Sequence, residues 1–181
     1  MRKIVDAVGK QRLTIEFLYA DLSVCTRCRE TDQNLEEAIS EVAKIVRVTG
    51  VDVVVKKIHV QSEEQAKALG FVSSPTIRID GKDIQFELKE SPCDSCGDLC
   101  GEDVLCRVWT YQGKEYTAAP KPMIIDAVLR EIYRGGTKTS QELSQIGLVP
   151  DNLKRFFASK HRKEKFDDCG RQSGLQARKC C

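Results

Sequence analysis

Residues 13–28, LTIEFLYADLSVCTRC, decide the fold of this chain. The apolar and β-branched run from Leu13 to Tyr19 predicts a buried strand, and Asp21–Ser23 predicts a turn after it. From Thr26 to Val48 apolar residues recur with helical spacing, which predicts a long helix. The sequence therefore places a Cys-x-x-Cys motif where a strand and its turn pass into a helix.

Beyond this helix, apolar periodicity and turn signals predict further strands and helices. Alternating runs on both sides of Asp80–Gly81 and of Gln112–Gly113 predict two hairpins. In the first hairpin, Phe86 and Leu88 are expected to lie on the same face as the isoleucines of the preceding strand. The order indicates an α/β domain with two strand-helix units before the hairpins. The expected elements are a strand over 51–60, a helix over 62–70, strands over 76–80 and 84–88, strands over 106–111 and 115–117, and a helix over 122–133.

The composition indicates a folded domain without a membrane segment. Hydrophobic residues make up 41% and charged residues 31% of the 181 residues, which are ordinary values for a globular protein. No apolar run approaches the roughly 18 residues that a membrane span needs, and charges at Asp6, Lys10 and Arg12 interrupt the first residues. We therefore expect no signal peptide, no membrane partner and a cytoplasmic location.

The distribution of charge divides the chain in two. The net charge of +2 combines −3 over residues 1–134 with +5 over residues 135–181. We expect one domain over residues 1–134, with a Cys-rich insertion over residues 91–118, and a basic, partly helical tail over residues 135–181. The tail is expected to form helices over 140–146 and 151–159, the second anchored by Phe156–Phe157, and to be mobile from Lys160 onward. Because aromatic residues do not alternate with its basic residues, we do not expect it to bind nucleic acid.

Nine cysteines are the outstanding feature of the composition. In a reducing cytoplasm they would not form a structural disulfide framework, so they need another chemical role. They also cluster, whereas cysteines used for packing would scatter along the apolar faces of helices and strands. The three clusters are Cys25 and Cys28; Cys93, Cys96, Cys100 and Cys106; and Cys169, Cys180 and Cys181.

The first cluster has the features of an exchangeable dithiol. A cysteine at a helix start lies beside unpaired backbone N–H groups and the positive end of the helix dipole, which favour its thiolate. Cys25 has that position and is the expected nucleophile. Cys28 lies one helical turn further along the same side, so it is the expected resolving thiol, which attacks a mixed disulfide on Cys25. A Cys-x-x-Cys pair on its own is equally consistent with half of a zinc site.

The order of elements around this pair, followed by Val72–Thr76 before a hairpin strand, resembles the thioredoxin and glutaredoxin superfamily over residues 13–134. The chain is more closely similar to prokaryotic thioredoxin-like proteins that carry a Cys-rich loop. The resemblance implies a three-layer α/β fold of order β-α-β-α-β-β-α, with the loop and an extra hairpin inserted before the last helix. It also implies a cis bond before Pro75, a catalytic role for Pro75 opposite the cysteine pair, and substrate binding by Ser74 and Thr76.

The motif departs from that of thioredoxins, which have Trp before the first cysteine and Gly-Pro between the two. Here Val24 precedes the first cysteine, and Thr26–Arg27 separates the pair. The resemblance therefore implies thiol-disulfide exchange, but it does not imply a redox poise, a direction or a substrate.

The second cluster places four thiols within 14 residues, at a spacing that could surround one tetrahedral soft metal ion such as zinc. Neighbouring acidic residues would favour a cation there. Three interpretations stay open: a loop stapled by a structural metal, a second redox pair in a disulfide relay, and a site for a substrate metal or a trivalent metalloid. Cys106 could instead point inward from its strand.

The expected topology brings this second cluster close to the first. Pro75 precedes a strand at the end of the sheet that carries Cys25, the turn at Asp80–Gly81 lies at the far end, and the strand through Leu88 returns. The Cys-rich loop should therefore leave the sheet beside Cys25, where it would serve as a second redox pair or a regulatory lid. The accessory thiols are either an arm that delivers thiols to this site or an incidental part of the tail: Cys169, Cys180 and Cys181.

These features together predict a cytoplasmic thiol-disulfide oxidoreductase whose exchange step needs no cofactor. Its substrate would be a disulfide-bonded protein or a small molecule, including a metalloid, and its exchange reaction could serve metal or metalloid detoxification. The alternative is a protein that binds and transfers a soft metal or metalloid, such as zinc, arsenic or mercury. That protein would use Cys93, Cys96, Cys100 and Cys106 with the tail cysteines.

Overall fold

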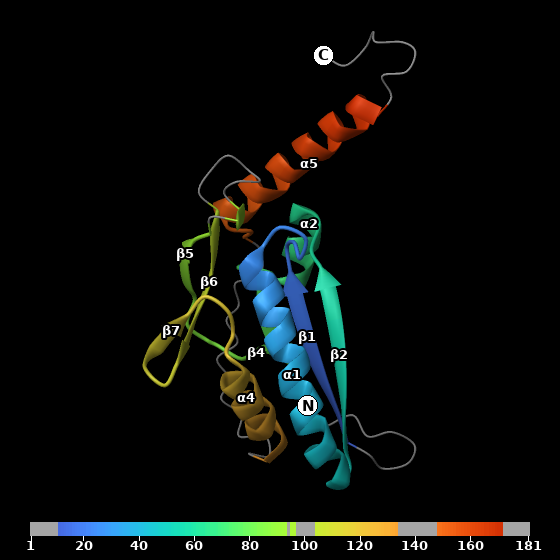
Figure 1. Cartoon of the computed structure of the whole chain (residues 1–181), viewed down its shortest axis with the longest axis vertical. Helices are drawn as coiled ribbons and strands as arrows, with labels where there is room; N and C mark the ends of the chain where they lie inside the picture. The colour runs from blue at the N-terminus through green and yellow to red at the C-terminus, as the bar shows by residue number, and fades with distance from the viewer. Residues whose placement is uncertain (1–10, 94, 97–103, 134–147, 172–181) are drawn as a thin grey trace.

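The computed structural model of the chain describes residues 11–93, 95–96, 104–133 and 148–171 and has a mixed α/β architecture (Figure 1). A four-stranded sheet has the order β2-β1-β3-β4, and a three-stranded sheet has the order β5-β6-β7. The strands are β1 (Gln11–Tyr19), β2 (Val51–His59), β3 (Thr76–Ile79), β4 (Lys82–Asp83), β5 (Lys89–Pro92), β6 (Leu105–Tyr111) and β7 (Lys114–Tyr116). The helices are α1 (Thr26–Val48), α2 (Glu63–Leu69), α4 (Lys121–Tyr133) and α5 (Asp151–Arg171).

Strand β1 has one parallel and one antiparallel neighbour. It pairs in parallel with β2 and antiparallel with β3, where Leu18 lies opposite Thr76. The helix α1 makes the crossover connection between the two parallel strands, as such a pair requires. The carboxyl end of β1, the start of α1 and the start of β3 therefore meet at one edge of the sheet, and this edge carries the cysteine pair.

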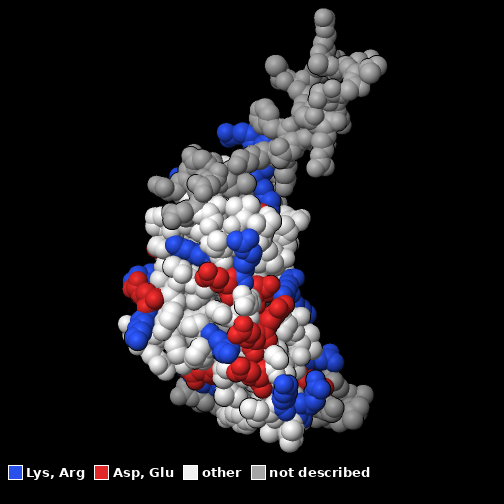
Figure 2. All heavy atoms as spheres, in the orientation of Figure 1, with Lys and Arg blue, Asp and Glu red and all other residues white. Residues whose placement is uncertain are grey.

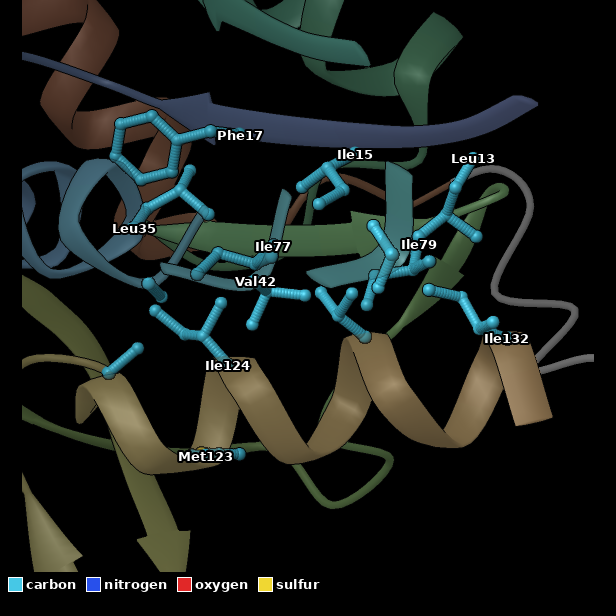
Figure 3. Packing of buried hydrophobic residues seen from close by; sticks show 14 of the residues in the cluster. Leu13, Ile15, Phe17, Leu35, Val42, Ile77, Ile79, Met123, Ile124 and Ile132 are labelled. Carbon is cyan, nitrogen blue, oxygen red and sulfur yellow. The ribbon is translucent and has the colours of Figure 1, made fainter. Parts of the chain in front are cut away.

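The main apolar core lies between the four-stranded sheet, α1 and α4. Alternate residues of β1 are fully buried, as the period of two along a strand requires, and α1 buries residues three or four positions apart. Figure 3 shows this packing, in which α4 lies against the side chains of β1, β3 and α1. Among the contributing side chains are Leu13, Ile15, Phe17, Leu35, Val42, Ile77, Ile79, Ile124 and Ile132.

Both predicted hairpin turns are confirmed. Asp80 and Gly81 have φ angles of 47° and 80°, and Gln112 and Gly113 have φ angles of 50° and 75°. Positive φ at both central residues is the geometry that matches the right-handed twist of the flanking strands. The first turn is also fixed to β1, because the carboxylate of Asp80 accepts a hydrogen bond from Thr14 N at 2.9 Å.

The strand predicted over residues 84–88 is wrong. Only Lys82–Asp83 pairs with β3, and the side chains of Phe86 and Leu88 are 66% and 42% exposed. Ile84 N still donates to Ile77 O of β3 at 3.1 Å, but from the next residue on the buried amide of Gln85 accounts for the difference, because its hydrogen bonds tie the chain to β6. Its partners are Glu87 O, Val108 O and Thr110 N.

The predicted helix over residues 151–159 starts as expected, but α5 continues to Arg171 through the segment that was expected to be mobile. Residues 160–166, KHRKEKF, are mostly long unbranched side chains, which lose little freedom in a helix and so extend one that is already formed. The predicted anchor is confirmed, because Phe156 and Phe157 are both buried. The helix predicted over 140–146 lies outside the described residues.

On the face that Figure 2 displays, acidic side chains gather in a band over α1, with basic side chains beside them. Lys57 lies within 2.7 Å of carboxylate oxygens of both Asp32 and Glu36, and Lys121 pairs with Glu37 and Glu41. The band is therefore partly neutralised by lysines from neighbouring elements. Among the described helices, none has the length and apolar character needed to cross a membrane.

Candidate functional site

Four cysteine sulfurs come together at the sheet edge where α1 begins. The Sγ atoms of Cys25, Cys93, Cys96 and Cys106 all lie within 4.8 Å of one another, and no residue of the four is more than 4% exposed. The expectation that the Cys-rich loop lies beside Cys25 is therefore confirmed. The four sulfurs differ from the predicted metal set, because Cys25 lies among them and Cys100 lies outside the described residues.

Cys25 is the N-cap of α1, as its position before the helical pattern predicted. Its Sγ accepts a hydrogen bond from the backbone N of Cys28 at 3.4 Å, in place of the oxygen that a capping Ser or Asp would supply. Hydrogen bonds from neighbouring thiols, first that of Cys106, lower the pKa of Cys25 although burial opposes them. The thiolate of Cys25 is therefore the form that its surroundings favour.

The other three sulfurs come from the two ends of the Cys-rich loop. Cys93 follows β5 directly, and its backbone N donates to Val104 O at 2.8 Å across the loop. Cys96 N donates to Cys93 O at 3.1 Å, so these two cysteines share one turn of the chain. Cys106 lies on β6, opposite Ser91 of β5, and its Sγ is 3.9 Å from that of Cys96. The pairing of β5 with β6 thus fixes both ends of the loop.

The two residues between Cys25 and Cys28 attach this loop to α1. Thr26 Oγ1 and Ser95 Oγ share a hydrogen bond of 3.0 Å. The guanidinium of Arg27 donates to Ser91 Oγ at 2.9 Å and to Pro92 O at 2.5 Å, with longer contacts to Ser91 O and Cys106 O. The residues that distinguish this motif from that of thioredoxins therefore hold the second cysteine cluster in place. No motif in the sequence indicates this role.

Cys28 lies behind the four sulfurs and contacts the loop before β3. Its thiol is fully buried and lies 3.3 Å from Ser74 Oγ, which in turn accepts from Ala20 N at 3.1 Å. A hydrogen bond to Cys25, together with burial, raises the pKa of Cys28 well above its ordinary value. The peptide bond between Ser74 and Pro75 is cis, as predicted.

The two residues expected to bind substrate already have partners within the chain. Ser74 O accepts a hydrogen bond from the backbone N of Arg107 in β6 at 2.8 Å. Thr76 pairs with β1 through its backbone, and its Oγ1 donates to Ser73 O at 2.6 Å. In this arrangement, the chain's own β6 lies against the loop that was expected to receive a substrate.

Helix α5 covers the same end of the sheet. Leu153, Phe156 and Phe157 are buried in one apolar cluster with Cys25 and Cys28. The only sequence signal for this contact was the pair of phenylalanines, which indicated docking but not the surface that receives it.

An ion pair links α5 to the turn before Cys25. Lys160 Nζ lies 2.9 Å from the carboxylate of Asp21, which also accepts hydrogen bonds from the backbone N of Ser23 and of Val24. Burial alone would raise the pKa of Asp21, but hydrogen bonds from Ser23 and Lys160 outweigh it and lower the pKa to about 2. This turn therefore depends on a carboxylate that stays charged.

The four sulfurs are spaced for a thiophilic metal ion. A Zn–S bond of about 2.3 Å in a tetrahedral site implies sulfur atoms roughly 3.8 Å apart, so the observed cluster needs only a small contraction. Four buried cysteines near one another could therefore hold a metal ion. Of the accessory thiols, Cys169 belongs to α5, and Cys180 and Cys181 lie outside the described residues.

Comparison with known proteins adds a family but no activity. A family model described as "Domain of unknown function (DUF2703)" matches residues 13–128. Neither the curated proteins nor the solved structures gave a match. The matched range begins in β1 and ends within α4, so it contains all four clustered sulfurs and Cys28 but not α5.

Proposed function

Because the chain belongs to the family described as a domain of unknown function, DUF2703, we propose a function from the geometry of its cysteines: it binds one thiophilic divalent metal ion, such as Zn²⁺. The observation that carries this proposal is the gathering of four buried sulfurs within 4.8 Å. In the proposed set, Cys25 replaces Cys100 of the ligand set that was predicted from the spacing of the loop cysteines. The ligands are Cys25, Cys93, Cys96 and Cys106.

The surroundings of the sulfurs suit a thiolate-bound metal. Four thiolates around a divalent ion leave two net negative charges, which the start of α1 and the guanidinium of Arg27 would offset. The backbone N of Cys28 donates to Cys25 Sγ, a contact of the kind that orients metal ligands from outside the first coordination sphere. Soft thiolate ligands select ions such as zinc over magnesium or calcium.

We further propose that the fold around this site is thioredoxin-like. Its support is the sheet order β2-β1-β3-β4, a Cys-x-x-Cys pair at the start of α1, and a cis proline at the start of β3 next to Cys28. The sheet of β5, β6 and β7 would then be the insertion that carries the Cys-rich loop.

A second candidate function is thiol-disulfide exchange by Cys25 and Cys28. It is favoured by the hydrogen bond that the backbone N of Cys28 donates to Cys25 Sγ and by the opposite directions in which the pKa values of the two thiols move. Cys25 is only 1% exposed, however, in one buried cluster with Cys93, Cys96 and Cys106 and with residues of α5. In this arrangement, a small disulfide could reach Cys25 more easily than a folded protein could. We therefore favour metal binding over thiol-disulfide exchange as the main function.

Metal titration tests the proposal. The reduced, chelator-treated full chain is titrated with Co²⁺, and thiolate-to-metal charge-transfer absorption is followed together with competition by a chelator of known affinity. We expect one ion per chain and a loss of affinity of at least about tenfold in Cys25→Ser, equivalent to about 1.4 kcal/mol. Cys28→Ser is the matched control, because its thiol is equally buried and only three residues away, and it should bind within about threefold of wild type.

Two outcomes would contradict the proposed site. Absence of charge-transfer absorption at saturating Co²⁺ would exclude a thiolate site altogether. Full affinity in Cys25→Ser, combined with loss of affinity in Cys100→Ser, would place the metal on the four cysteines of the loop alone.

A further inference from the structure

Cys25 belongs to two groups of thiols that cannot use its sulfur at the same time. We propose that formation of a disulfide between Cys25 and Cys28 releases the bound metal, and that bound metal protects the same pair from oxidation. The site then acts as a redox-controlled metal store. This inference rests on the proposed metal site and assigns a role to Cys28, which that site does not use.

The contacts of Cys28 separate it from the metal ligands while keeping it beside one of them. Its backbone N donates a hydrogen bond to Cys25 Sγ at 3.4 Å. On its other side the thiol lies 3.3 Å from Ser74 Oγ, and it is not one of the four mutually close sulfurs. Cys28 therefore remains an uncoordinated thiol next to a coordinated one.

A sulfur in a disulfide carries no thiolate charge, so it is lost as a ligand for zinc. Oxidation of Cys25 would leave three thiolates, those of Cys93, Cys96 and Cys106, in a site spaced for four sulfurs. By thermodynamic linkage, the factor by which oxidation weakens metal binding is the factor by which metal binding disfavours oxidation. One shared sulfur is enough to couple the two reactions.

The oxidant is a low-molecular-weight disulfide, and the step balances in two exchanges. The thiolate of Cys25 attacks one sulfur of the small disulfide, forms a mixed disulfide and expels one small thiolate. Cys28 loses its proton, attacks Cys25 Sγ and expels the second small thiolate. Two electrons pass from the cysteine pair to the small disulfide, and the two leaving thiolates take up the proton of Cys28 and one from solvent.

Burial restricts which disulfides can act. Cys25 is 1% exposed and Cys28 is fully buried, with Phe156 of α5 in the same apolar cluster. A small oxidant reaches Cys25 only when the side chains that bury it, among them those of α5, move aside. A metal ion bound to Cys25 and to both ends of the loop would oppose this movement. Bound metal would therefore protect Cys25 from oxidation in two ways, by coordinating its sulfur and by restricting the access of the oxidant.

The test compares zinc-loaded and metal-free full chains in glutathione buffers of increasing disulfide content. Zinc release is read with a chromogenic chelator, and disulfides are identified by peptide mass mapping after acid quenching. We expect zinc release and the Cys25–Cys28 disulfide to appear together, at least about tenfold more slowly than the same disulfide forms in metal-free protein. Cys28→Ser should retain zinc at disulfide levels that empty the wild type, because reduced glutathione reverses its mixed disulfide.

A variant in which Cys93, Cys96 and Cys106 are all replaced by serine keeps the pair and removes three ligands. Zinc should no longer slow its oxidation. Equal oxidation rates with and without bound zinc in the wild type, or zinc release that accompanies only disulfides among the loop cysteines, would overturn the inference while leaving the metal site standing. Failure of the reduced wild type to bind zinc at all would instead overturn the proposed function.

Discussion

Replacing Arg27 by glutamine should weaken metal binding without removing a metal ligand. The guanidinium of Arg27 reaches from α1 to the two strands that carry the ends of the Cys-rich loop. It donates to Ser91 Oγ at 2.9 Å and to Pro92 O at 2.5 Å, one residue before Cys93, and it lies 3.5 Å from Cys106 O. Without it, the loop should dock less tightly on Cys25.

The contacts allow an estimate of the effect. A hydrogen bond from a charged donor contributes about 1.5–3 kcal/mol, and only two of the four contacts of Arg27 are shorter than 3.2 Å. Glutamine can replace one of these two, and the site is only partly buried, so a net loss near 1.4 kcal/mol is expected. This loss corresponds to an approximately tenfold decrease in metal affinity, with about 100-fold as the limit if both bonds are lost.

Chelator competition with Co²⁺ measures this affinity, and thermal unfolding of the metal-free protein reports any general loss of fold. Arg29→Gln is the matched control, since Arg29 lies two residues away and makes one 3.4 Å contact to Ser23 O. Arg27→Lys keeps the charge but not the fork of donors, so it should recover only part of the affinity. Wild-type affinity in Arg27→Gln, or an equal loss in Arg29→Gln, would show that the contacts of Arg27 do not support the metal site.

Two further predictions concern the cover of the site. Asp21→Asn should lower the free energy of unfolding by about 1–2 kcal/mol at neutral pH, because hydrogen bonds and the pair with Lys160 hold the pKa of this carboxyl at about 2. Since that pKa lies below the ordinary 3.8, the stabilisation is complete only from about pH 5 upward and is lost as the pH falls through 2. Denaturant unfolding that gives the same difference between wild type and Asp21→Asn at pH 7 and at pH 2 would contradict this. Phe156→Ala should leave a cavity that costs about 3–4 kcal/mol and should speed alkylation of Cys25 in metal-free protein, measured by mass spectrometry, whereas wild-type alkylation rates would argue against α5 as a cover.

The parts of the fold that the sequence predicted are those that local signals determine. The start of α1 followed from the break between strand and helix periodicity before Thr26, and both hairpin turns followed from residue pairs that accept positive φ. The loop's position beside Cys25 was predicted from the path of the chain, although the segment that returns to this end of the sheet is β5, paired with β6, and not the strand expected over 84–88.

The parts that the sequence did not predict depend on contacts between distant residues. Arg27 binds backbone carbonyls, and since every residue offers one, no residue type marks its partners. The spacing of the loop cysteines predicted Cys100 as the fourth ligand. In the structure, the sulfurs of Cys93, Cys96 and Cys106 instead lie beside that of Cys25, which belongs to a distant part of the sequence. Similarly, residues 84–88 have the alternation of a strand, but one buried amide, that of Gln85, ties them to β6.

X-ray absorption of the zinc-loaded, reduced protein tests most directly whether Cys25 completes a four-sulfur metal site. We expect four sulfur ligands at about 2.3 Å in the wild type and in Cys28→Ser. Cys25→Ser should give three sulfurs and one lighter oxygen or nitrogen ligand. A wild type with fewer than four sulfur ligands, or four sulfurs that persist in Cys25→Ser, would contradict it.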